Sequence, residues 1–185
     1  MSVDAGLDVA EAADSIFIDG ALYSAPAGST RPTSATAALP AQYVGHGFWS
    51  SEGVTQSSSK STNSVRAFQQ NQLVAETVTE GTGTTSLVLL QGNAANASLF
   101  YGAEVNTTTG AVTWNPGRAN GRREFVLDKV NQDGEKERIV GEGEVTEMAD
   151  RVTTYGAVTG YGVTITWYGE PTVYNTGWIA GGGGV

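Results

Sequence analysis

Residues 122–147 read RREFVLDKVNQDGEKERIVGEGEVTE, and this stretch decides the fold class. A three-residue turn at Gln132, Asp133 and Gly134 fixes its register, because glycine supplies the left-handed conformation needed at the third turn position. In that register aliphatic side chains face each other and opposite charges meet. The facing pairs are Lys129 with Glu137, Asp128 with Arg138, Leu127 with Ile139, Val126 with Val140, and Arg122 with Glu144. The pattern predicts a long twisted hairpin whose turn lies at Asp133 and Gly134.

A two-residue turn fits this stretch less well. It would place Lys129 opposite Arg138, which brings like charges together. It would also place Asp128 opposite Ile139, which leaves Ile139 without an apolar partner. In the preferred register we expect the charged pairs to be exposed and to contribute little to stability. Burial of the aliphatic pairs should dominate, so Asp128→Ala should be nearly silent.

Short apolar and β-branched stretches on either side predict further strands. Their ranges are 16–25, 64–70, 72–80, 84–91 and 159–169, the second and third joined by a tight turn at Asn71. The last strand places Val163, Ile165 and Trp167 on one face. The spacing of Ala and Leu predicts one short helix over residues 94–101, and residues 107–120 indicate a loop.

Three segments have little that could build a core. Residues 55–63 are almost wholly Ser, Thr, Gln and Lys, which predicts a loop or a hairpin tip. We expect residues 1–15 to form a mobile arm and residues from about 170 to 185 to form a loose, mobile tail. The rest is expected to be a single domain.

Length and charge exclude several classes of protein. The chain has 185 residues with 39% hydrophobic content, which suits one domain, and the 25 glycines beside many Val, Tyr and Trp favour a mainly β fold. With 10 basic against 19 acidic residues the net charge is −9, the wrong sign for binding nucleic acid. The chain has no cysteine, which excludes thiol chemistry. Neither a membrane-spanning run nor an export signal is expected.

No catalytic, metal or cofactor motif is found. His46 is the only histidine and is expected to be structural, because one histidine alone identifies neither a metal site nor a catalytic triad. The lysines lie in no phosphate-binding loop. Glu142 and Glu144 share a strand face as a glycosidase pair could, but acids on an exposed hairpin face are common. We predict no metal, because Asp133 and Asp150 stand alone.

The order of features along the chain resembles the tail tube proteins, or major tail proteins, of long-tailed bacteriophages, particularly those of actinobacterial hosts. The residues that carry the resemblance are GALYSAPAGST at 20–30, Pro32, the stretch 39–54, VRAF at 65–68 and LFYG at 99–102. The resemblance implies a β-sandwich or barrel-like core with one flanking helix. It also implies a virion protein, made in the host cytoplasm, that forms hexameric rings stacked into a tube around passing DNA. Tape measure and other tail proteins would be its partners.

The resemblance gives the polar segments expected roles. We expect the 55–63 run to contact the adjacent ring and the acids of residues 142–147 to form a patch facing the lumen or an interface, the latter by charge alone. The hairpin of residues 122–147 would project or lie between subunits. The ring-contact candidates are Thr55, Gln56, Ser57, Ser58, Ser59, Lys60, Ser61, Thr62 and Asn63, and the acidic candidates are Glu142, Glu144 and Glu147.

Two other classes of function stay open at this point. A β-sandwich carbohydrate-binding or adhesin module could use its tryptophans as stacking platforms, and these are Trp49, Trp114, Trp167 and Trp178. A β-rich hydrolase is the weaker alternative, because no nucleophile and base are recognisable together.

Overall fold

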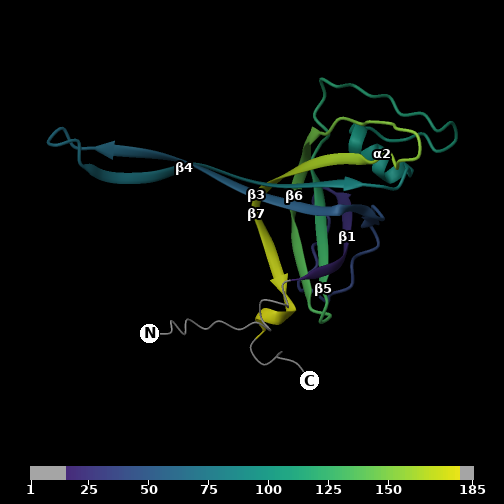
Figure 1. The fold of residues 1–185 in the computed structure, drawn as a ribbon, viewed down its shortest axis with the longest axis horizontal. Helices are drawn as coiled ribbons and strands as arrows, with labels where there is room; N and C mark the ends of the chain where they lie inside the picture. The colour runs from purple at the N-terminus through teal and green to yellow at the C-terminus, as the bar shows by residue number, and fades with distance from the viewer. Residues whose placement is uncertain (1–15, 180–185) are drawn as a thin grey trace. The chain divides into compact units, whose positions relative to one another are not determined.

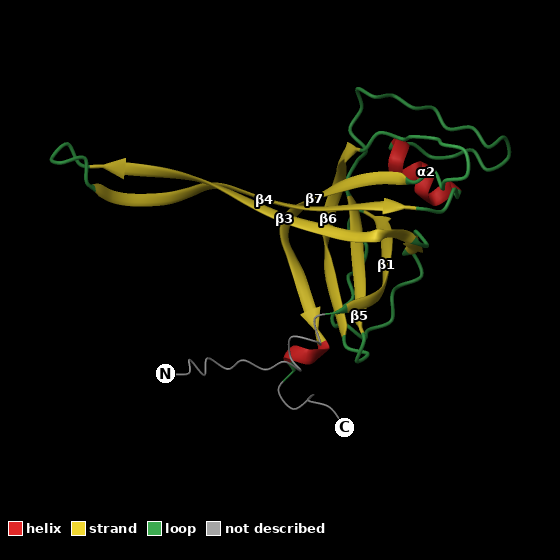
Figure 2. Cartoon of the chain, in the orientation of Figure 1, coloured by secondary structure: helices red, strands yellow, loops and turns green. Residues whose placement is uncertain are grey.

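The computed structural model describes residues 16–179 and is mainly β (Figures 1 and 2). Its seven strands form one sheet in the order β2-β1-β5-β6-β7-β4-β3. The strands are β1 Phe17–Pro26, β2 Val44–Gly45, β3 Trp49–Arg66, β4 Leu73–Leu89, β5 Arg123–Asn131, β6 Lys136–Met148 and β7 Tyr161–Asn175. The helices are α2 Ala94–Tyr101 and the 3₁₀ turn η1 Thr176–Trp178. The predicted fold class, with one short helix and a long hairpin, is confirmed.

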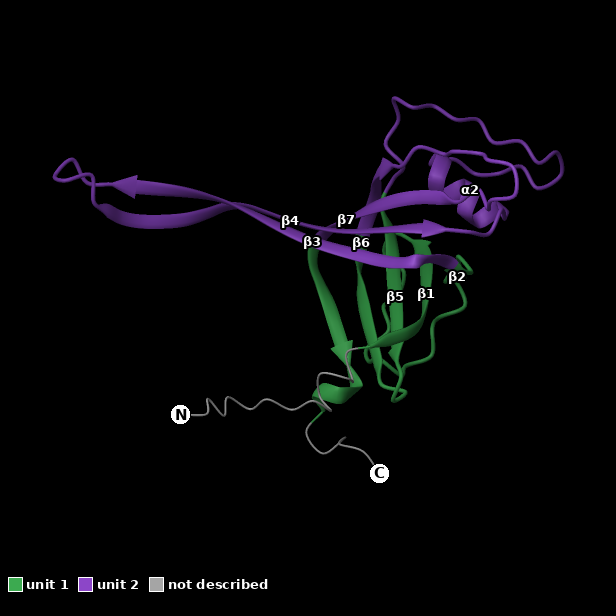
Figure 3. Cartoon of the chain, viewed as in Figure 1, with its two compact units in different colours: residues 1–48, 122–142, 169–185 green, residues 49–121, 143–168 purple. Residues whose placement is uncertain are grey.

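The chain divides into two compact units that are each assembled from separate segments (Figure 3). The described part of unit 1 comprises residues 16–48, 122–142 and 169–179, and unit 2 comprises residues 49–121 and 143–168. Strands β6 and β7 each contribute to both units.

Unit 1 is built on the antiparallel pairing of β1 with β5. Leu22 lies opposite Leu127 in this register, and both are fully buried, as is Phe125. Every residue of β5 from Glu124 to Asp128 is buried, so both faces of this strand are covered. The hairpin of residues 122–147 therefore does not project. The expected projection was wrong because a strand between β1 and β6 is internal to the sheet. The alternative, that the hairpin lies between subunits, stays a prediction.

The turn between β5 and β6 has the three-residue form. Gly134 has a φ of +84°, its N–H donates to the Asn131 carbonyl at 3.1 Å, and the Asn131 N–H donates to the Glu135 carbonyl at 3.0 Å. The Asn131 side chain also accepts from the N–H groups of Asp133 and Glu135. Lys129 reaches Glu137 at 2.6 Å across the strands, as the register from the sequence requires.

Gly134→Val should destabilise the protein by about 1–3 kcal/mol, because a β-branched residue is strained at positive φ even though open space surrounds this position. Urea unfolding measures the loss. Gly134→Asn is the control and should lose less, because Asn tolerates the left-handed conformation better. Equal losses for the two variants would contradict a cause in the backbone conformation.

Helix α2 lies in unit 2 and has the predicted bounds. The Asn93 side chain caps its first turn by accepting from the Asn96 N–H at 2.8 Å. Gly102 ends it with a φ of +63°, close against Asn120, whose amide donates to the Leu99 and Phe100 carbonyls. A side chain at Gly102 would clash with Asn120, so glycine is required there on both counts.

Strand β7 confirms the predicted inner face, because Val163, Ile165 and Trp167 are all buried. Its length differs from the prediction. The segment from residue 170 is not loose where it is described, since β7 continues to Asn175 and η1 follows. The Lys136 N–H donates to the Thr176 hydroxyl at 2.9 Å, which holds this end against the β5–β6 turn in unit 1. The expected arm of residues 1–15 and the last part of the tail, residues 180–185, lie outside the described residues.

Residues 55–63 are strand rather than loop, which corrects the expectation. They form the middle of β3 and pair with residues 77–86 of β4, so the two strands predicted over 72–80 and 84–91 are one continuous strand. The prediction failed because it required an apolar face. Here pairing with a Thr-rich partner strand satisfies the backbone hydrogen-bonding groups without an apolar face.

Candidate interaction surfaces

The outer half of the β3–β4 hairpin has little support from other strands. Strand β7 pairs with β4 only over residues 83–89, whereas β3 pairs with β4 along nearly its whole length. Figure 3 shows the hairpin running out from the rest of unit 2. Among the described residues, residues 73–82 of β4 therefore have one strand neighbour, and β3 is an edge of the sheet. A two-stranded ribbon of this kind is marginally stable in water by itself.

Large apolar side chains are exposed around the turn of this hairpin. Phe68 is 100% exposed, and Val65, Leu73 and Val74 are between 49% and 65% exposed. We call these four residues the tip cluster. The Ala67 N–H donates to the Gln72 carbonyl at 2.8 Å, and the Arg66 guanidinium donates to the Asn71 carbonyl at 3.1 Å. Exposed apolar groups gathered in this way mark an interaction surface. This surface was not predicted from the sequence, although four large apolar residues around an otherwise polar turn are a visible signal for it.

The structure places the three acidic candidates along β6. Glu142 is half-buried and accepts from Arg122 at 3.2 Å. Glu144 accepts from the Gly121 N–H at 2.9 Å and from the Tyr168 hydroxyl at 3.3 Å. Glu147 is exposed. Both Glu142 and Glu144 are engaged by donors, so neither resembles a free catalytic carboxylate.

His46 is buried beside Ser24, with 2.8 Å between the His46 Nε2 and the Ser24 Oγ. Their exposures of 1% and 3% leave the hydroxyl out of reach of a substrate, which suits a structural role. Within residues 16–179 no cluster of three or more metal-ligating side chains occurs, and no helix is long and apolar enough to cross a membrane. Trp167 is buried and donates to Thr85, so it cannot serve as a stacking platform.

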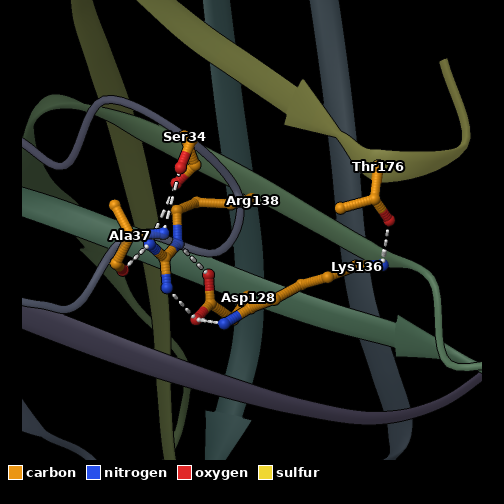
Figure 4. Close-up of polar contacts among 6 residues, drawn as sticks. All are labelled: Ser34, Ala37, Asp128, Lys136, Arg138 and Thr176. Carbon is orange, nitrogen blue, oxygen red and sulfur yellow. Dashed lines mark hydrogen bonds and ion pairs between the residues drawn. The ribbon is translucent and has the colours of Figure 1, made fainter. Parts of the chain in front are cut away.

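A buried ion pair ties β5 and β6 to the connection between β1 and β2 (Figure 4). Arg138, which is 2% exposed, donates to both carboxylate oxygens of Asp128 at 2.6 and 2.8 Å. Its remaining terminal nitrogen donates to the Ser34 and Ala37 carbonyls at 3.1 and 2.6 Å. Lys136 approaches Asp128 at 2.7 Å. The expectation that this pair is exposed was wrong, because the connection carrying Ser34 and Ala37 lies against Arg138.

A second ion pair holds the same connection. Arg31 donates to Glu124 at 2.7 Å, and this hydrogen bond raises the pKa of Arg31. Nearby, the Tyr43 hydroxyl is buried without a hydrogen-bond partner among the described residues. Burial, and then the charge of Glu124, raise the pKa of Tyr43 above its usual value of 10.0.

Tyr43→Phe should stabilise the protein by about 1 kcal/mol, because it removes a buried hydroxyl with no hydrogen-bond partner. The raised pKa of Tyr43 means that the folded state disfavours the phenolate, so wild-type stability falls as pH rises through that pKa, above 10. The variant should lose less stability in the same range. Urea unfolding from pH 8 to 11 tests both effects, and a destabilised variant would contradict the absence of a partner.

The chain is similar to phage proteins of one family. A family model described as phage tail tube protein matches residues 14–181. Among solved structures, a chain of the virion of a native gene transfer agent particle is 13% identical, with a TM-score of 0.43, and the match covers 73% of this chain and 91% of that one. No curated protein sequence matches. Because the family model spans nearly the whole chain, this protein belongs to the phage tail tube protein family.

Proposed function

We propose that this structural virion protein polymerises into stacked hexameric rings and that the resulting tube conducts phage DNA. The observation that carries the proposal is the β3–β4 hairpin, whose outer half has an exposed tip cluster and an unpaired sheet edge. Such an edge favours pairing with further strands, and assembly with other copies of the chain covers it. The whole chain acts as one tail tube subunit in this proposal, without catalysis or cofactor.

The ring contact of residues 55–63 is retained in this proposal with a changed geometry. These residues lie on an exposed edge strand and not on a loop, so their Ser and Thr side chains and backbone groups are presented in a row. We place the contact with the adjacent ring along this row and at the tip cluster beyond it.

The proposed lumen is lined by negative charge. Each subunit carries −9, so a hexameric ring would carry −54, and even a fraction of that charge facing inward would repel DNA phosphates. Glu142, Glu144 and Glu147 remain the candidates for this wall or for an interface. DNA would pass without specific binding. The tape measure protein and other tail proteins are the expected partners, and synthesis would take place in the host cytoplasm without membrane attachment.

Negative-stain electron microscopy of the purified protein tests the proposal. Rings or tubes with sixfold symmetry are the expected result. Monodisperse monomers that bind glycans would instead favour a carbohydrate-binding or adhesin module, and rings of another symmetry would contradict the hexamer.

A further inference from the structure

A chemically labile pair of residues, Asn120 and Gly121, ends the loop that follows helix α2 in unit 2. Asn120 is the only asparagine of the chain that is followed by glycine. Because glycine has no side chain to shield its backbone nitrogen, the Gly121 nitrogen can reach the Asn120 side chain wherever the backbone is free to turn. Asparagine is among the thermolabile residues of proteins. The pair therefore has the chemistry for a reaction of the chain with itself.

This reaction is a deamidation and consumes only water. The Gly121 backbone nitrogen attacks the Asn120 Cγ, the Cγ–Nδ2 bond breaks, and the leaving amine takes up the proton of the Gly121 N–H and departs as ammonia. Water then opens the five-membered succinimide ring at either of its two carbonyl carbons. The products are aspartate and isoaspartate, so a neutral amide becomes a carboxylate and no electrons are gained or lost.

In the folded chain both reacting groups are held by other contacts. The Asn120 amide nitrogen donates to the Leu99 and Phe100 carbonyls at 3.2 and 3.3 Å. The Gly121 N–H donates to a Glu144 carboxylate oxygen at 2.9 Å. The attack requires the Asn120 side chain to leave the end of α2 and the Gly121 nitrogen to give up its proton. Each of these contacts opposes one of the two requirements.

Glu144 opposes the loss of the proton in two ways. Its hydrogen bond favours the neutral Gly121 N–H, and its negative charge disfavours an anionic nitrogen beside it. The carboxylate is half-buried and accepts from the Tyr168 hydroxyl at 3.3 Å, which helps to fix it in place. We infer that Asn120 is a site of spontaneous deamidation and that Glu144, together with the end of α2, holds this reaction back in the folded subunit.

Deamidation would disrupt the end of α2. A carboxylate at position 120 cannot donate to the Leu99 and Phe100 carbonyls, and these residues are only 1% and 6% exposed. It would also place a negative charge at the C-terminal end of the helix, where the helix dipole is itself negative. Phe100 packs edge to face on Tyr161 of β7, with ring centroids 5.4 Å apart. The modification therefore loosens the packing of α2 on the sheet within unit 2.

Mass spectrometry of the purified protein tests where the reaction occurs. The chain is incubated at pH 8 in water enriched in oxygen-18, which labels each deamidated residue, and is then digested into peptides. In urea, Asn120 should react faster than every other asparagine, including Asn71, which is exposed in the fold and is followed by Gln72. Gly121→Ala should slow the reaction in urea, because the added side chain shields the nitrogen. Folded wild-type protein should react at Asn120 several-fold more slowly than the chain in urea.

Variants of the folded protein test the role of Glu144. Glu144→Ala should deamidate at Asn120 several-fold faster than the wild type, and Glu144→Gln, which keeps an acceptor oxygen, should restore most of the protection. Glu142→Ala is the matched control and should keep the wild-type rate, because Glu142 lies on the same strand and bonds to Arg122 instead of Gly121. Rates are compared at a temperature at which circular dichroism shows each variant to be folded.

A variant that carries the product tests the consequence. Asn120→Asp should melt at a lower temperature than the wild type, since it lacks the two donated hydrogen bonds and adds the charge. An unchanged melting temperature would show that the modification leaves α2 intact and would overturn this part of the inference.

Other results would overturn the remaining parts. A different asparagine that reacts faster than Asn120 in urea would move the site. Equal rates for the wild type and Glu144→Ala, or equal acceleration by Glu142→Ala, would remove the protective role of Glu144. If Glu144→Ala does not fold, hydrogen exchange of the wild type replaces it, and rapid exchange of the Gly121 N–H would contradict the protective contact. None of these measurements requires rings or tubes, so their failure leaves the proposed function untouched.

Discussion

Asp128→Ala should destabilise the protein by about 3–5 kcal/mol, which is a large part of the 5–15 kcal/mol typical of a folded domain. The carboxylate is 5% exposed and accepts from Arg138 and Lys136. Its removal leaves the Arg138 guanidinium buried, with the Ser34 and Ala37 carbonyls as its hydrogen-bond acceptors. A buried charge without its counter-ion is among the costliest defects in a protein interior. Urea unfolding at pH 7 measures the loss.

Two controls separate this cause from a general sensitivity of the strands. Glu142→Ala removes a carboxylate from the more exposed pair with Arg122 and should cost less than about 1 kcal/mol. Combining Asp128→Leu with Arg138→Met removes both buried charges and should recover much of the stability. A loss below about 1 kcal/mol for Asp128→Ala would show that the ion pair is not needed.

The parts of the fold that could be predicted from the sequence are governed by local rules. The β5–β6 turn follows from Gly134 and the facing charges, and helix α2 follows from the spacing of Ala and Leu between Asn93 and Gly102. In both cases the deciding groups lie within a few residues of each other, so the local sequence pattern is enough to predict the element.

The errors arose where distant segments decide the structure. Whether Asp128 is exposed depends on residues 27–43, which cross over it from about a hundred residues away in the chain, and no periodicity in β5 reveals that cover. The long β3 strand depends in the same way on its partner β4. Its Ser and Thr residues suit an edge strand as well as a loop, so composition alone could not distinguish the two.

The same difference between local and distant determinants applies to the candidate surfaces. The acids of β6 were visible in the sequence, but their partners Gly121 and Tyr168 come from other segments. The tip cluster becomes recognisable only when exposure is known, because Phe68 looks like a core residue in the sequence alone.

Replacing residues 61–80 by an Asn-Gly turn should abolish tube formation and leave the subunit folded. The shortened hairpin would close at the Lys60 and Gly81 pair of the existing register, and Asn-Gly suits a tight hairpin turn. It keeps residues 83–89 of β4, which pair with β7 and include the buried Leu87 and Leu89. What it removes is the tip cluster and the ribbon that carries it. Circular dichroism should show an unchanged melting cooperativity, and electron microscopy should show no tubes.

A matched control leaves the hairpin at full length. Gln70→Gly changes an exposed turn residue with a φ of +58°, which glycine adopts without strain, so this variant should assemble like the wild type. Comparing the two variants separates the effect of losing the hairpin surface from the effect of changing its turn residues. Tubes of normal length from the shortened variant would show that assembly depends on other surfaces, and the exposed ribbon would then need a different explanation. Loss of both folding and assembly would show instead that the outer ribbon stabilises the subunit itself, although β7 does not reach it.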